Sequence, residues 1–143
     1  MQEDTRKLLQ ECNSGCKMAI NSMVQVQDYI NDEGLEKLIR ESKERHEKLE
    51  AESAKLLEEN GEKEKDPTMM ASAFSWLTTE MKMLMNKDSK QIAKIMMDGC
   101  HMGIEGLAGK LNEFENAAPE SRKLAEKIIK EEEDFMQQLK AYL

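Results

Sequence analysis

The chain has little of what β-sheets, membrane spans and nucleic-acid interfaces require. Among its 143 residues, aromatic side chains make up only 4%, and there are 2 prolines and 7 glycines. No window approaches the roughly 18 consecutive apolar residues that a membrane span needs. The net charge is −8, from 21 basic and 29 acidic side chains, which argues against nucleic-acid binding through clustered Lys and Arg. The abundant Glu, Lys, Leu and Met instead favour helices.

Several functional signals are also missing from the sequence. The N-terminal residues lack an apolar stretch that could act as a secretory signal. The cysteines are Cys12, Cys16 and Cys100, an odd number, so we expect reduced thiols in a cytoplasmic protein rather than a disulfide framework. No phosphate-binding glycine loop, nucleophile–base set or dinucleotide motif is present. We therefore expect a protein that is not an enzyme.

Apolar residues recur at spacings of three and four, which predicts amphipathic helices that face a common core. Short turns near residues 32 and 117 make residues 4–60 and 89–142 two antiparallel helical hairpins. The crossover over 61–88 contains a short helix over 67–85, which opens with Asp66 as cap and Pro67 at the first helical position. The sequence thus predicts a single all-α domain over residues 1–143, built as a four-helix bundle.

The two predicted hairpins resemble each other. Residues 14–20 align with residues 98–104, with Gly, Cys, Met and Ile in register. After a two-residue shift at the turn, Leu38 aligns with Leu124. This pattern predicts a duplicated hairpin, and the duplication pairs Cys16 with Cys100.

Three segments suggest a family. They are Phe74-Ser75-Trp76-Leu77 in the crossover, residues 98–104, and Leu139-Lys140-Ala141-Tyr142-Leu143 at the end. With these segments the whole chain resembles the ferritin-like superfamily, and within it a group of small uncharacterised bacterial proteins, some described as stress-related. The resemblance implies a ferritin-like bundle of two antiparallel hairpins joined by the crossover.

The resemblance also implies where metal ligands would lie. Metal-bearing members supply a Glu from the first and third long helices and Glu-x-x-His from the second and fourth. Here Cys16 and Cys100 stand at the first pair of positions. Lys43 precedes His46 by three residues, and an isoleucine precedes Glu132 by three. Neither Glu-x-x-His motif is present, so a conventional di-iron centre is not expected.

Cys16, His46, Cys100 and Glu132 are the candidate metal ligands, because all four lie on the predicted apolar stripes near mid-bundle. Two thiolates, an imidazole and a carboxylate suit a transition metal such as zinc, and iron follows from the resemblance. The other interpretation has the cysteines packing as small apolar residues. His46 and Glu132 would then form a buried polar pair that sets helix register. We favour this second interpretation, with no cofactor.

Two further patterns in the sequence are weaker candidates for metal sites. Asp98, His101 and Glu105 lie some 100–160° around the helix from Cys100 at 100° per residue, so we expect them in solvent. The Met-x-Met-x-Met string at residues 81–85 invites a Cu(I) site, but its sulfurs would scatter around the helix axis.

We expect a cytoplasmic, bacterial, ferritin-like bundle that acts through assembly or through contact with a protein partner. A homodimer is compatible with this fold type. The alternative is a metal-binding or redox protein with a degenerate ferritin-like central site. Nucleic acid and membranes are not expected as partners.

Overall fold

The computed structural model describes residues 1–65, 75, 78–80, 82 and 88–143, and the structural statements below concern these residues. They are all-helical and contain no strand. The elements are four long helices and a final 3-10 turn: α1 (Glu3–Gln27), α2 (Glu33–Glu59), α4 (Ser89–Glu113), α5 (Pro119–Leu139) and η2 (Lys140–Tyr142). No helix in this part of the chain is long and apolar enough to cross a membrane.

Polar side chains cap the starts of α2 and α4, after the predicted turn near residue 32 and at the predicted start of the second hairpin at residue 89. The Oδ1 atoms of Asp32 and Asp88 accept hydrogen bonds from backbone N–H groups three residues later, at 3.0 and 2.9 Å. After α2, Gly61 adopts a positive φ of 69°, which glycine tolerates without strain. Of the predicted short helix over 67–85, only residues 75, 78–80 and 82 are described, and these are helical.

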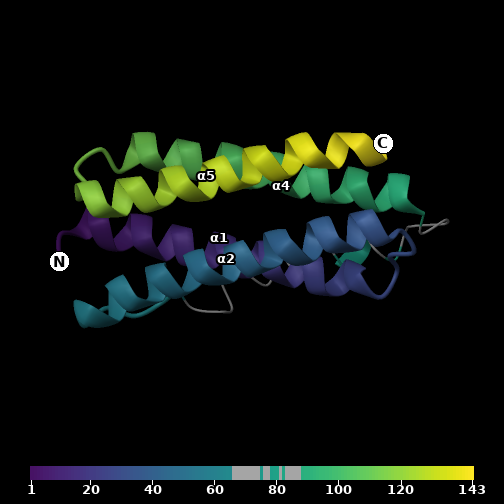
Figure 1. Ribbon diagram of the computed structural model, residues 1–143. Coiled ribbons are helices and arrows are strands. Elements are labelled where there is room, and N and C mark those ends of the chain that lie inside the picture. Colours follow the sequence, from purple (N-terminus) through teal and green to yellow (C-terminus); the bar gives the residue numbers. More distant parts are fainter. Residues whose placement is uncertain (66–74, 76–77, 81, 83–87) are drawn as a thin grey trace.

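The long helices pack as two antiparallel pairs, α1 with α2 and α4 with α5 (Figure 1). The pairs lie against each other, with α1 on α4 and α2 on α5. In Figure 1, α2 ends near the N-terminus, whereas α4 begins at the opposite end of the molecule. The two hairpins are therefore joined between helix ends that lie far apart, as the predicted crossover requires.

The first residues after α2 are attached to α1. Lys17 Nζ lies 2.5 Å from Glu64 Oε2, and Lys65 Nζ lies 2.9 Å from Glu11 Oε1. The carbonyl of Lys63 also accepts a hydrogen bond from α1. The start of the crossover thus runs along α1, held by charged groups at the surface.

The buried apolar side chains form two clusters. The Phe135 cluster lies toward the α1–α2 turn and contains Met23, Val26, Leu35, Leu38, Ile39, Ile92, Ala93, Ile95, Met96, Cys100, Phe135 and Leu139. The Phe114 cluster lies toward the α4–α5 turn and contains Leu8, Leu9, Cys12, Cys16, Leu57, Leu107, Leu111, Phe114, Ala117, Leu124, Ala125 and Ile128. Three buried polar residues, Ser42 and His46 on α2 and Glu132 on α5, lie between the two clusters along these helices. They place the candidate site.

Candidate functional site

His46 on α2 and Glu132 on α5 form a buried pair between the two apolar clusters. The side chain of His46 is 0% exposed and that of Glu132 is 8% exposed. His46 Nε2 is hydrogen-bonded to Glu132 Oε1 across the two helices. The structure therefore confirms the pairing of these two side chains, which joins the two hairpins at mid-bundle.

The hydrogen bonds around His46 define where its protons lie. His46 Nδ1 lies 2.8 Å from the carbonyl oxygen of Ser42, which can only accept, so Nδ1 carries a hydrogen. The other ring nitrogen faces a carboxylate oxygen, so one further proton lies between Nε2 and Oε1. The Ser42 hydroxyl donates to Glu131 Oε1 at 3.1 Å, and Arg45 Nε donates to the same oxygen at 2.8 Å. The buried pair is thus enclosed by a network with few free donors or acceptors.

The surroundings of His46 favour its charged form. Burial is the largest influence and disfavours the imidazolium, but the hydrogen bond and charge of Glu132 oppose it. The Ser42 carbonyl and the charge of Glu131 add to this effect. Together these groups raise the pKa of His46 above its ordinary value.

The three cysteines are buried and free. Burial raises the pKa of the Cys12 thiol to about 12. Burial also raises the pKa of Cys16, helped by Cys12 and by the charge of Glu132. The pKa of Cys100 is raised by burial, then by the charge of Glu132 and a hydrogen bond to it. Buried thiols that keep their protons are weak nucleophiles, so the redox alternative gains no support.

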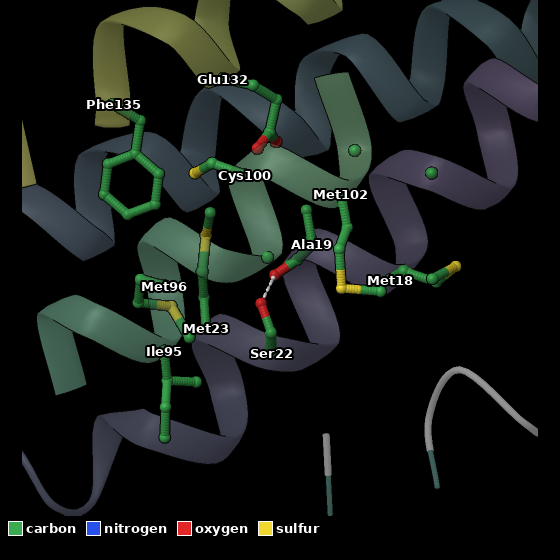
Figure 2. Close-up of a pocket in the computed structure, with 13 residues that line it drawn as sticks. Met18, Ala19, Ser22, Met23, Ile95, Met96, Cys100, Met102, Glu132 and Phe135 are labelled. Carbon is green, nitrogen blue, oxygen red and sulfur yellow. Dashed lines mark hydrogen bonds between the residues drawn. The ribbon is translucent and has the colours of Figure 1, made fainter. Parts of the chain in front are cut away.

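The four candidate metal ligands do not form one compact group. Cys100 lies beside Glu132 (Figure 2), but Cys16 belongs to the Phe114 cluster and Cys100 to the Phe135 cluster. Within the described ranges, no group of three or more His, Cys, Asp or Glu side chains could hold a metal ion. The short cysteine side chains stay among their apolar neighbours, and His46 and Glu132 bind each other. The zinc or iron hypothesis therefore stays a prediction without support from these residues.

The Asp98–His101–Glu105 string lies in solvent, as expected. The side chains of His101 and Glu105 are 73% and 79% exposed, and His101 Nε2 lies 3.8 Å from Glu105 Oε2. Residues 81, 83 and 85 of the methionine string lie outside the described residues.

Sequence reasoning missed an open cavity between α1 and α4 (Figure 2). It has a volume of about 180 Å³ and is lined by Gly15, Met18, Ala19, Ser22, Met23, Ile95, Met96, Gly99, Cys100, Met102, Gly103, Glu132 and Phe135. A second cavity of about 200 Å³ shares Gly15, Met18, Met102, Gly103 and Glu132 with it. The two cavities thus form one groove along these helices, which we call the α1–α4 groove.

The sequence did contain a signal for this groove. Gly15 and Met18 on one wall align, in the internal repeat, with Gly99 and Met102 on the other. The repeat therefore placed equivalent residues on both walls, but only the packing of α1 on α4 brings them together. Glu132 reaches both cavities of the groove from α5, and Glu11 and Lys65 also line the second one.

Comparison with known proteins finds no matching family model, no matching curated protein and no matching solved structure. The buried pair and the α1–α4 groove are therefore the features from which a function can be proposed.

Proposed function

We propose that this chain is a non-enzymatic, ferritin-like helical bundle that acts by contact with another protein chain through the α1–α4 groove. The helix directions support the ferritin-like assignment. Helices α1 and α5 run in one direction, and α2 and α4 run in the opposite direction (Figure 1). One long crossover between two antiparallel hairpins is typical of ferritin-like folds.

The glycines of α4 carry the proposal for protein contact. Four glycines lie within this helix, at positions 99, 103, 106 and 109. Each costs about 0.8–1.0 kcal/mol relative to alanine in a helix interior. A Cβ atom at Gly99, Gly106 or Gly109 would meet nothing within 4 Å in the described part of the chain, and at Gly103 it would make only an ordinary contact. Packing among these residues thus does not require the glycines, whereas close approach by another chain would.

The chemistry of this surface supports the same proposal. Charged residues make up 35% of the chain, yet the α4 wall of the groove is formed by uncharged residues, among them Gly99, Met102, Gly103 and Gly106. Met102 is 48% exposed, and flexible methionines adapt to partners of different shape. A groove with one uncharged, glycine-lined wall is suited to a helix or loop of a partner.

A matched pair of substitutions tests the role of the groove. Gly106 lines the groove. Gly109 lies one turn further along α4, outside both cavities of the groove, in a neighbouring hollow where Gly106 meets the charged residues Glu105, Lys110 and Glu113. A Cβ atom at either position would meet nothing within 4 Å among the described residues, and both glycines are exposed, so Gly106→Gln and Gly109→Gln are both expected to fold. Sedimentation velocity over a concentration series measures self-association, and we expect Gly106→Gln to weaken it while Gly109→Gln does not.

Contact with a different protein is tested by a photo-crosslinking residue placed at position 106 or at position 109 in cells. We expect discrete crosslinked products from position 106 only. A chain that stays monomeric at every concentration and gives the same crosslinks from both positions would contradict the proposal.

The alternative function, metal binding or redox chemistry at Cys16, His46, Cys100 and Glu132, has less support. Among the described residues no group of three or more His, Cys, Asp or Glu side chains could hold a metal ion, and the imidazole and carboxylate already bind each other.

A further inference from the structure

Five sulfur-containing side chains line the first cavity of the α1–α4 groove, the one of about 180 Å³. The thioethers of Met18 and Met23 come from α1, and those of Met96 and Met102 come from α4. Cys100 adds a thiol from α4. Figure 2 shows the side chains of Met23, Met96 and Cys100 on the same side of the cavity, with Glu132 next to Cys100. Two helices thus supply five soft donors to a single space.

These sulfurs extend from the surface into the protein. Met102 is 48% exposed and Met18 is half-buried, whereas Met23 and Met96 are 2% and 3% exposed. Methionine has three rotatable bonds and a polarisable sulfur, so the outer thioethers can pass an ion inward by changing rotamer. The arrangement therefore provides both an entrance and an interior site.

The described lining of the cavity contains no group that would repel a cation. Glu132 is the charged residue among those that line it, and no basic side chain belongs to the described lining. Glu132 lies next to Cys100 in the cavity (Figure 2), and its own hydrogen-bond partner, His46, is not among the lining residues. A small, weakly hydrated cation that prefers sulfur matches these conditions, whereas Mg²⁺ and Ca²⁺ prefer oxygen donors.

We propose that this cavity binds one Cu(I) ion through the sulfurs of Met23, Met96 and Cys100, with Met18 and Met102 as the entry donors. Soft sulfur ligands bind Cu(I), zinc and iron–sulfur clusters, and a set of two thioethers with one thiolate favours Cu(I), because zinc and iron–sulfur sites are held by thiolate, imidazole or carboxylate ligands. This donor set differs from the Cys16–His46–Cys100–Glu132 set considered above, and it does not depend on the proposed protein contact.

Binding is a ligand exchange without electron transfer. The ion arrives as Cu(I) and remains Cu(I). The S–H bond of Cys100 breaks, a Cu–S bond forms, and the proton leaves to the buffer, so the net charge of the cavity is unchanged. The two thioethers donate lone pairs and lose no proton. One proton is therefore released for each ion bound.

The test is a competition for Cu(I) between the purified full chain and the chromogenic chelator bicinchoninate, without oxygen and with a non-thiol reductant. We expect the chain to withdraw one equivalent of Cu(I). Met23→Leu/Met96→Leu keeps the side-chain volume nearly constant but removes two donors. This variant should bind at least about tenfold more weakly, since even outer-shell changes around a metal have effects of that size.

Met136→Leu is the matched control, because Met136 packs against the same Phe135 cluster but does not line the cavity. It should bind as tightly as the unmodified chain. Cys100→Ser should bind more weakly and release no proton. Gly106→Gln, which tests the protein contact, should leave Cu(I) binding unchanged, so the two proposals can fail separately.

The proposal is overturned if the unmodified chain withdraws no Cu(I) from the chelator. It is also overturned if the double methionine variant binds as tightly as the unmodified chain. An equal loss in Met136→Leu would overturn it as well, because binding would then follow core packing rather than the sulfur donors.

Discussion

The two hairpins carry matching residues on their first helices and complementary residues on their second. Cys16 on α1 and Cys100 on α4 occupy aligned positions and are both buried. At mid-bundle, α2 instead presents His46 where α5 presents Glu132. Two imidazoliums or two carboxylates at these positions would repel each other in a dry interior. The hairpins are therefore joined by the His46–Glu132 hydrogen bond. Two copies of the same hairpin could not form this bond, because each would present the same side chain.

Removing one member of the His46–Glu132 pair should produce the largest loss of stability. His46→Leu leaves the carboxyl of Glu132 buried without its partner, and removing one member of a buried pair costs about 3–5 kcal/mol. His46→Leu/Glu132→Leu removes both polar groups, and apolar replacements of a buried pair are often neutral or stabilising. Urea unfolding of the unmodified chain and both variants measures these differences.

Glu133→Gln is the control for that experiment, because Glu133 is the exposed neighbour of Glu132. A surface substitution should change the free energy of unfolding by no more than about 0.5 kcal/mol. If the single and double leucine variants lose the same stability, the pair does not couple the hairpins.

A second comparison uses one leucine from each hairpin in the Phe114 cluster. Leu107 on α4 is 8% exposed, whereas Leu49 on α2 is only partly buried. Leu107→Ala should cost about 2–5 kcal/mol. Leu49→Ala should cost less, because its side chain gives up fewer contacts and less buried area. Thermal unfolding of the two variants measures both effects, and an equal loss would contradict this placement of Leu49.

The smallest expected effect concerns pH. Because the pKa of His46 is raised above 6.5 in the folded chain, its charged form stabilises the fold fully below 6.5. That contribution is lost as the pH rises through the raised pKa. The free energy of unfolding, measured by urea at several pH values from about 6 to about 9, should therefore fall for the unmodified chain. In His46→Leu/Glu132→Leu, the free energy of unfolding should fall less over this pH range, because the contribution of His46 is absent. Identical pH profiles for this variant and the unmodified chain would contradict the raised pKa of His46.

Much of the architecture could be predicted because it depends on local sequence. Helix starts at Asp32 and Asp88 follow from capping, and the apolar stripes follow from helical spacing. The stripes are less definite in detail. Helical spacing alone allows Leu56 or Leu57 to face the core at the end of α2, and the structure buries Leu57 while Leu56 is only partly buried. This ambiguity arises because packing against another helix decides which of two adjacent residues points inward.

The candidate site was predicted only in part. The His46–Glu132 pair could be found because both residues are polar and lie on apolar stripes. The α1–α4 groove could not, since nothing in one helix specifies how close its neighbour lies. The exposed faces of Gly99 and Met102 become walls of a cavity only when α1 packs beside α4.

The glycines of α4 have a consequence for motion as well as for binding. A helix with four such residues has weak intrinsic helicity, so α4 relies on α1 and α5 to remain folded. Its amide hydrogens near Gly103 and Gly106 should exchange through brief local openings long before the whole chain unfolds. A ligand or partner that fills the groove would suppress those openings. Its binding would therefore slow amide exchange along the length of α4.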